Sequence, residues 1–428
     1  MKRDDAPTVD GGRLWGDLME LAAITDPAKP YTRRSFTPLF AQGRAWLAQS
    51  MEDAGLGVRI DAGGNLIGRI EGTDPDAGVI AIGSHSDSVV GGGRFDGIAG
   101  VLAGIAVARS LARSGTRLRS AIEVIDFLAE EPSAFGLSCI GSRAITGHLD
   151  AAMLAMTDPE GRILAEALTT VGGDPDRLVQ ARRRDLKAFL ELHIEQGPVL
   201  EAAGIPVGIV TTIVGIRRIE VAFAGDANHA GTTPMAIRRD ALVPAAETIA
   251  AVRDVASRYS AEAGGYFVAT VGIVEVSPAA ANVIPRSARI VIDARSSDSD
   301  MLQRFTQAID EVSAAAARAA KVERSRFDIL SDGVPAECSP ALRRHLNAAA
   351  DSLGIAAREM PSGAGHDAAF LALACPSAML FVPSRDGKSH TPKEWTEPDA
   401  LTTGAVLLLN TVLRVDADSG LDLEHDRL

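Results

Sequence analysis

Two kinds of hydrophobic pattern divide the chain. Between about Gly57 and Val210, short runs of consecutive apolar residues alternate with longer segments of helical period. The runs "GVIAIGS", "SAIEVIDFLA" and "AFLELHI" have the length and composition of strands buried on both faces, whereas Ile98–Leu111 has a helical pattern. This alternation predicts an α/β domain with a mostly parallel sheet.

A different pattern begins after Ile213. "RRIEVAFAG" alternates apolar and polar residues, and a helix is predicted to follow. The strands "YFVATVGIVEV" and "SARIVIDAR", a second helix and the strand "RSRFDIL" complete a β-α-β-β-α-β order, which is that of a ferredoxin-like α+β unit. The strand "SAMLFVPS" and a helix over Pro398–Val415 then resume the first pattern. We predict a discontinuous α/β domain, residues 1–212 and 331–428, with an inserted domain of residues 213–330.

Polar side chains follow three of the predicted strands at the point where each strand ends. Ligands of open α/β sheets bind outside the carboxyl ends of the strands, so these side chains should meet at one edge. Two more candidates come from the start of the next helix and from the loop after "SAMLFVPS". The set consists of His85, Asp96, Glu130, Glu131, His193 and His390.

Imidazole and carboxylate groups together suit Zn²⁺ and neighbouring first-row metals. Six of them exceed the needs of one tetrahedral ion and suit two ions about 3.5–4 Å apart that share a carboxylate. Glycines in "VVGGGRFDG" permit the loop to fold back, so that Asp96 can approach His85. We expect Asp87 to accept the other ring N–H of His85 and to fix its tautomer.

Each signal has a plainer interpretation when it is taken alone. A His-x-Asp pair is more often part of a turn, and an "EE" pair is usually solvated. "GAGHDA" matches a dinucleotide-binding pattern, but no clear strand precedes it. The joint occurrence of these residues at strand ends is what favours a metal site.

Charge and cysteine content narrow the function classes. The 428 residues include 43 basic and 56 acidic ones, a net charge of −13, which disfavours nucleic acid or an anionic membrane as partner. An anionic substrate would therefore need a local arginine. Three widely spaced cysteines without a CxxC pair indicate a reducing, cytoplasmic setting. We see neither a secretory signal nor an uninterrupted membrane-spanning run.

Seven motifs in order carry a resemblance: "GSHSDSVVGGGRFDG", "AEEPSAFGLSCIGSRA", "ELHIEQGPVLE", "NHAGTTPM", "NVIP", "SGAGHDA" and "SHTPKEWT". With them the chain resembles the two-zinc amidohydrolases of the aminoacylase/carboxypeptidase-like metallopeptidase superfamily. Within that superfamily it resembles the branch of N-carbamoyl-L-amino-acid hydrolase, β-ureidopropionase and allantoate amidohydrolase.

The resemblance implies two divalent metal ions, zinc or else manganese, cobalt or nickel, that share Asp96. One ion would be held by His85, Asp96 and His193. The other would be held by Asp96, Glu131 and His390.

The resemblance also implies the remaining roles. Glu130 would be the general base and then the general acid, with His229 at the substrate carbonyl, supplied by the partner of a homodimer. The inserted domain would be a lid and dimerisation domain. The residues that would complete substrate binding are Gln196, Asn282, Arg295, Gly363 and Gly365.

The implied reaction is hydrolysis of the carbamoyl C–N bond of a small N-carbamoyl amino acid or related ureido acid, with release of ammonia and carbon dioxide. Allantoate or ureidoglycolate hydrolysis remains an alternative, as does aminoacylase or dipeptidase action on an ordinary amide. Two departures from the family pattern, Ala134 and Ser86, leave the substrate open. A metal-binding or ligand-binding module without turnover is disfavoured, because Glu130 is present beside Glu131.

Overall fold

The computed structural model describes residues 6–262 and 265–421, in two compact units. The first comprises Met1–Thr211, Glu337–Met360 and His366–Leu428, and the second comprises Thr212–Ala336 and Pro361–Gly365. The second unit thus includes twelve residues that the predicted boundaries assign to the other domain: Thr212, residues 331–336 and Pro361–Gly365. Each unit is described by itself.

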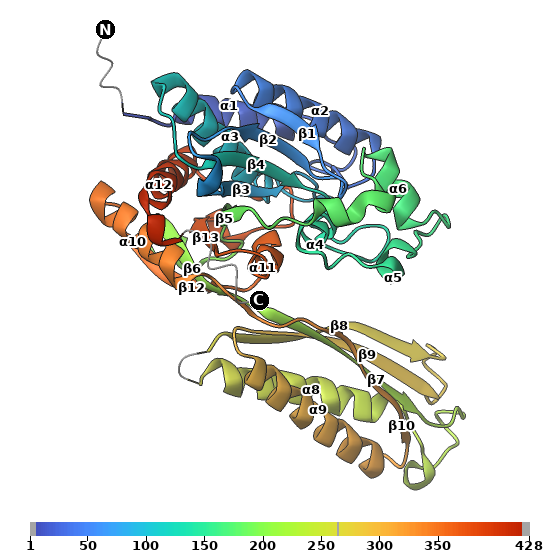
Figure 1. The fold of residues 1–428 in the computed structure, drawn as a ribbon. Coiled ribbons are helices and arrows are strands. Elements are labelled where there is room, and N and C mark those ends of the chain that lie inside the picture. Colours follow the sequence, from blue (N-terminus) through green and yellow to red (C-terminus); the bar gives the residue numbers. More distant parts are fainter. Residues whose placement is uncertain (1–5, 263–264, 422–428) are drawn as a thin grey trace. The chain divides into compact units, whose positions relative to one another are not determined.

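The first unit is built on a nine-stranded sheet in the order β1-β2-β4-β3-β5-β13-β6-β11, with β12 paired to β6 (Figure 1). Its strands are β1 Gly57–Ile60, β2 Leu66–Ile70, β3 Val79–His85, β4 Ala121–Phe127, β5 Leu186–Ile194, β6 Val207–Ile213, β11 Ala336–Glu337, β12 Ala357–Ser362 and β13 Ser377–Val382. The central strands β4, β3, β5 and β13 run parallel, and β1, β2 and β6 pair antiparallel to their neighbours.

Helices cover this sheet. They are α1 Gly11–Ala22, α2 Pro38–Asp53, α3 Ile98–Ser114, α4 Ile140–Thr146, α5 Ala151–Leu154, α6 Leu164–Thr170, α7 Val199–Ala203, α10 Pro340–Leu353, α11 Asp367–Leu371 and α12 Pro398–Ala417. One core cluster joins α1, α3, α10 and α12 to the sheet, and a smaller cluster lies around α4 and α6. Every residue of the four central strands is buried, which explains their continuous apolar runs.

Among the described helices, α12 is the one that is long and apolar enough to cross a membrane. In the structure, 56% of its apolar window is buried, and it packs against α3, α10 and α1. Its apolar character is therefore that of a core helix.

The second unit is a four-stranded antiparallel sheet in the order β10-β7-β9-β8. Its elements are β7 Gly215–Ala224, α8 Leu242–Ser260, β8 Phe267–Ser277, β9 Ser287–Ser296, α9 Ser299–Ala319 and β10 Glu323–Asp332. The two helices share one core cluster with the sheet. The predicted class, a mostly parallel α/β sheet with a ferredoxin-like α+β unit, is confirmed.

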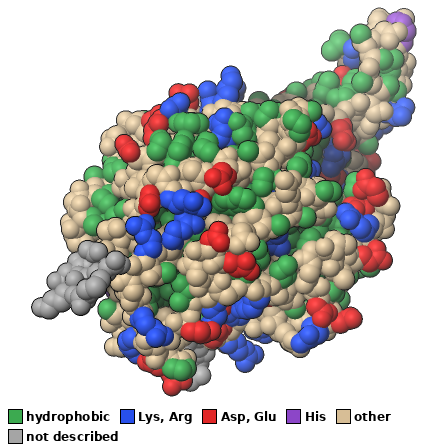
Figure 2. All heavy atoms as spheres, turned by 90° about the horizontal axis from the view of Figure 1, so that it is seen from above, with side chains coloured by type: hydrophobic (Ala, Val, Ile, Leu, Met, Phe, Trp, Pro, Cys, Tyr) green, Lys and Arg blue, Asp and Glu red, His purple; other side chains and the backbone are tan. Residues whose placement is uncertain are grey.

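Charged side chains of both signs share the visible surface, and the cysteines lie in the interior. On the face shown in Figure 2, basic and acidic side chains are interspersed, so no broad single-sign patch is seen among the described residues there. Cys139, Cys338 and Cys375 are all buried free thiols.

A buried ion pair supports the strand that leads to the predicted glutamates. Arg44 on α2 donates from Nε to Asp126 Oδ2 at 2.9 Å and from Nη2 to the Asp126 carbonyl at 2.8 Å. The Asp126 side chain is fully buried and that of Arg44 is 8% exposed. Removing one partner of such a pair leaves an uncompensated charge in the interior.

We therefore expect Arg44→Ala to lower the free energy of unfolding by roughly 3–5 kcal/mol. Urea unfolding followed by tryptophan fluorescence measures this, because Trp15, Trp46 and Trp395 all lie in the first unit. Arg113→Ala is the control, since Arg113 pairs with Asp10 at the surface with 63% of its side chain exposed. This substitution should lower the free energy of unfolding by less than about 1 kcal/mol. Equal losses in the two variants would contradict the assignment.

Candidate active site

Parallel pairing brings two histidines together. Ile82 on β3 is paired with Leu190 on β5, and the same step along each strand leads to His85 and His193. Their ring centroids are 6.0 Å apart. Both side chains are buried, with 2% and 1% exposure.

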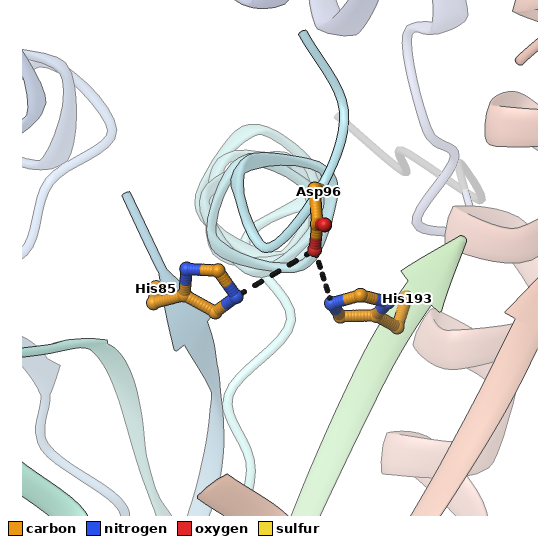
Figure 3. A group of neighbouring side chains, drawn as sticks. All are labelled: His85, Asp96 and His193. Atoms are coloured by element: carbon orange, nitrogen blue, oxygen red, sulfur yellow. Dashed lines mark ion pairs between the residues drawn. The ribbon is translucent and has the colours of Figure 1, made fainter. Parts of the chain in front are cut away.

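Asp96 approaches the two histidines from the turn directly before α3, where Asp96 and Gly97 precede the helix (Figure 3). Its Oδ1 lies 3.1 Å from His193 Nε2 and 3.8 Å from His85 Nε2. The approach depends on Gly97, which has a φ of +66°, and a Cβ there would lie 2.4 Å from the His85 ring. Glycine is thus required for both its conformation and its lack of a side chain.

The other oxygen of Asp96 belongs to a second group. His390 Nε2 lies 3.0 Å from Asp96 Oδ2 and 3.2 Å from Glu131 Oε1. His390 follows β13 in a loop and has a positive φ of 55°. Its side chain is 49% exposed, whereas Asp96 and Glu131 are buried.

The geometry of both groups suits divalent ions. Within each group, the candidate ligand atoms lie within 4.8 Å of one another. Ligand atoms on a tetrahedral zinc ion, each about 2.0–2.1 Å from it, would be about 3.3 Å apart, close to the contacts made by Asp96. Buried carboxylates also require compensating positive charge.

The pKa values of the site residues reflect this need for positive charge near buried carboxylates. Burial opposes ionisation of Asp96, but His193 and His390 hold the pKa of its carboxyl well below the usual range. Hydrogen bonds to Asp96 and Glu131 raise the pKa of His390 to about 10. Imidazolium groups thus supply the positive charge that bound cations could supply instead.

Glu130 lies beside the two groups and belongs to neither. Its Oε2 is 3.6 Å from His85 Nε2, and Cys139 Sγ lies 3.7 Å from Oε1. Burial, reinforced by Glu131 and opposed by His85, holds the pKa of Glu130 well above its usual range. A buried carboxyl of raised pKa can take up and return a proton near neutral pH.

Asp87 contacts the His85 ring with both its backbone and its side chain. His85 Nδ1 lies 3.0 Å from the backbone carbonyl of Asp87 and 3.5 Å from its carboxylate. The carboxylate also accepts the backbone N–H of Glu130 at 3.2 Å. Asp87 thus orients the imidazole, mainly through its carbonyl, and its side chain connects the loop after β3 to the loop after β4.

Gln196 is also placed near the first group. Its Nε2 donates to Asp96 Oδ2 at 2.8 Å, and its backbone has a φ of +59°. In this structure the side chain therefore contacts a candidate ligand, whereas the sequence predicts a contact with substrate.

The remaining predicted substrate residues lie in the second unit. Arg295 donates from Nε to Asp293 Oδ1 at 2.8 Å and from Nη1 to the Gly363 carbonyl at 3.1 Å. Nη2 makes no hydrogen bond among the described residues. A Cβ at Gly365 would meet Ile216 at 3.8 Å, an ordinary van der Waals distance.

His229 and Asn282 are exposed side chains on adjoining segments of the second unit. His229 forms an isolated bridge with Val283, and Ala230 N–H donates to the Asn282 carbonyl at 2.9 Å. His229 Nδ1 accepts N–H groups of Gly231 and Thr232 at 3.0 and 3.2 Å, which fixes the ring and leaves Nε2 as the other polar atom.

Comparison with known proteins identifies the family of the chain. Residues 81–414 match Peptidase family M20/M25/M40. The chain belongs to this family. It is similar to an N-carbamoyl-L-amino acid amidohydrolase of Geobacillus stearothermophilus, 43% identical over 94% of this chain and 98% of that protein. It is also similar to the allantoate amidohydrolase of Escherichia coli, 35% identical over 90% and 92% of the two chains.

A solved member of the hydantoinase/carbamoylase amidases, from Burkholderia multivorans, has the same fold. It aligns with a TM-score of 0.88 at 36% identity and covers 97% of this chain and 100% of its own.

Several buried residues of this M20 chain escaped sequence analysis. His366 packs on His193 with ring centroids 4.6 Å apart, and with Glu191 these two form a third cluster of ligand-type atoms. Glu394 is fully buried and hydrogen-bonds the backbone of Asp96. Both His366 and Glu394 stand inside motifs quoted above. His366 comes four residues after β12, a strand that the sequence analysis missed in front of "GAGHDA", and Glu394 lies twelve residues beyond the end of β13. Strand-end reasoning therefore gave no signal for either residue.

The shared carboxylate makes a prediction about metal content. Asp96→Ala should lose both ions, since each group loses a ligand, whereas His390→Ala should lose one. Elemental analysis after dialysis against metal-free buffer measures this, with exposed His148 as the control position (His148→Ala). Full metal content in Asp96→Ala would be inconsistent with a shared ligand.

Proposed function

We propose that this M20 hydrolase cleaves the carbamoyl C–N bond of a small N-carbamoyl amino acid or related ureido acid, releasing ammonia and carbon dioxide. One observation carries the proposal. The two oxygens of Asp96 face two separate ligand groups, and Glu130 stands beside them without belonging to either. The similarity to an N-carbamoyl-L-amino acid amidohydrolase supports the choice of substrate class.

Two divalent ions, zinc or manganese, cobalt or nickel, would be held by the two groups that share Asp96. When bound, such ions polarise a carbonyl as Lewis acids and lower the pKa of water toward about 7. The chain supplies their positions: His85 and His193 from strands of the sheet, Asp96 from the turn before α3, and His390 from a loop. Because the His85 ring is held at Nδ1 by the Asp87 carbonyl, its Nε2 faces the site.

Proton transfer falls to Glu130. The carboxyl would take the proton of the attacking water and then hand it to the departing nitrogen, which leaves as ammonia. The carbamic acid left on the amino acid then loses carbon dioxide and frees the amino group. Its surroundings favour the protonated form, so the group is suited to hold the proton between these two steps. Asp87 holds the Glu130 backbone in place.

Arg295 would bind the carboxylate of the substrate. Asp293 and the Gly363 carbonyl hold two of its donors, and Nη2 is left to the ligand. A planar guanidinium suits a carboxylate, and it answers the problem of binding an anion to an acidic chain. His229 would meet the substrate carbonyl, with Asn282, Gln196, Gly363 and Gly365 around it. In this proposal the second unit acts as a lid.

Allantoate is the second candidate substrate, favoured by the similarity to an allantoate amidohydrolase. Ureidoglycolate belongs to the same chemical class. Ordinary amides, as in an aminoacylase or dipeptidase, could use the same ligands and base. Ammonia separates the classes, because hydrolysis of a dipeptide releases none.

The test is ammonia release by zinc- or manganese-loaded protein from N-carbamoyl-L-amino acids, β-ureidopropionate, allantoate and a dipeptide panel, with and without chelator. We expect chelator-sensitive ammonia from one of the ureido acids. Amino acid release from dipeptides alone, without ammonia from any ureido acid, would overturn the proposal.

Glu130→Gln should retain both metals and lose about 10²–10⁴-fold in kcat, since the amide cannot accept and return the proton. Steady-state kinetics and elemental analysis on the same preparation measure both. The control is Glu160→Gln, at an exposed position of the first unit. Near-normal turnover in Glu130→Gln would remove this residue from the assigned role.

Arg295→Ala should raise KM roughly 10–100-fold, as expected for loss of about 1.5–3 kcal/mol from a charge-assisted contact, with metal content unchanged. Arg289 on the same strand pairs with Glu220 and Glu275, so Arg289→Ala is a matched control with normal KM. Loss of metal from Arg295→Ala would argue against the assignment of Arg295 to substrate binding and of other residues to metal binding.

The working form is proposed to be a homodimer in the cytoplasm. The β8 strand is at an edge of its sheet, with Ile273 and Val274 exposed by 45% and 50%. An apolar edge strand is a template for pairing, and a second copy supplies a self-complementary partner through a two-fold axis. Three free thiols fit a reducing compartment.

A further inference from the structure

Glu394 is a buried carboxyl group beside the shared ligand Asp96. It is 0% exposed and lies in the loop between β13 and α12. Oε1 accepts the backbone N–H groups of Phe95 and Asp96 at 2.8 and 3.2 Å, and Oε2 accepts the Ser389 hydroxyl at 2.8 Å. Among the described residues, no lysine or arginine pairs with it. These neutral donors offset part of its desolvation.

These donors belong to the two chain segments that supply the shared carboxylate and the exposed histidine. One pair of donors is the backbone at Asp96 itself. The third is Ser389, which directly precedes His390 and whose Oγ also lies 3.0 Å from Asp96 Oδ2. Glu394 therefore connects the loop after β3 to the loop after β13 at the point where they meet.

The loop "GGGRFDG" closes directly on this carboxylate. A Cβ at Gly93 would lie 1.7 Å from Glu394 Oε1, with the rest of the carboxyl within 2.3 Å. Position 93 thus requires glycine because of the Glu394 side chain. A residue that merely filled the interior would not need such close approach of the backbone.

We propose that Glu394 is a positioning residue that sets the orientation of the Asp96 carboxylate toward both ligand groups. The inference rests on the proposed function, because it assumes that Asp96 binds both ions. Glu394 acts through hydrogen-bond acceptance, so a neutral side chain of the same shape should serve. A glutamine can keep one oxygen on the two N–H groups and turn its amide toward the Ser389 oxygen.

The test compares Glu394→Gln with Glu394→Ala in metal-loaded, full-length protein. Affinity is measured by chelator competition with Mn²⁺, and the ligand geometry by the visible absorption of the Co²⁺-loaded protein. We expect Glu394→Ala to bind metal about 10–100-fold more weakly, the usual effect of losing a partner that orients a ligand, and to show a changed Co²⁺ spectrum. Glu394→Gln should restore both within a few fold.

Asp416 gives a matched control for general destabilisation. It is a buried carboxylate that accepts the backbone N–H groups of Arg119 and Ser120 at 3.0 and 2.7 Å. These two residues directly precede β4, whereas Glu130 and Glu131 follow the opposite end of that strand. Asp416→Ala should lower the unfolding midpoint and leave metal affinity and spectrum unchanged. An equal loss of affinity in Asp416→Ala would overturn the inference, as would wild-type affinity in Glu394→Ala.

Ser389→Ala is the second variant if Glu394→Ala fails to fold. It removes the hydroxyl between Glu394 and Asp96 Oδ2 and is expected to weaken Mn²⁺ binding several-fold; an unchanged affinity counts against the inference. Measurements on the wild-type protein distinguish failure of the proposed function from failure of the role of Glu394. Without metal binding or ammonia release in the wild type, the proposed function fails. With both present and Glu394→Ala normal, only the role of Glu394 fails.

Discussion

The site depends on one carboxylate that faces two ligand groups at once. Asp96 offers Oδ1 to His193 and Oδ2 to His390, so the two groups are coupled by a single side chain. Its place is determined by the backbone: a left-handed Gly97, a Gly93 without room for a Cβ, and N–H groups held by Glu394. The parallel sheet supplies the rigid part, because its strand ends bring His85 and His193 to the same level.

Electrostatics explain why such a site would take up cations. Asp96, Glu131 and Glu394 are buried close together, and the side chain of neighbouring Glu130 is 11% exposed. Without metal, bound protons reduce this excess of negative charge. The pKa of His390 is raised to about 10 and that of Glu394 to about 7. A fold that concentrates acids in this way is stable only with compensating positive charge, and ions bound at the two groups would provide it.

Sequence reasoning was effective where periodicity and topology determine the outcome. Strands buried on both faces appear as continuous apolar runs, and the side chains that end them must meet, which located His85, Glu131 and His193. It could not show that Asp87 uses its carbonyl toward His85, because a side-chain pattern carries no information on backbone acceptors. Glu394 was equally hidden, since it binds the N–H of Phe95 from 299 residues away. The family resemblance, and not the pattern, drew attention to Arg295.

The most direct measurement of the central claim is electron paramagnetic resonance of the manganese-loaded protein. Two Mn²⁺ ions about 3.5–4 Å apart that share a carboxylate should be spin-coupled and give a multi-line spectrum at two ions per chain. A plain six-line spectrum of an isolated ion, at saturation with one manganese per chain, would contradict a shared Asp96 and the two-metal account built on it.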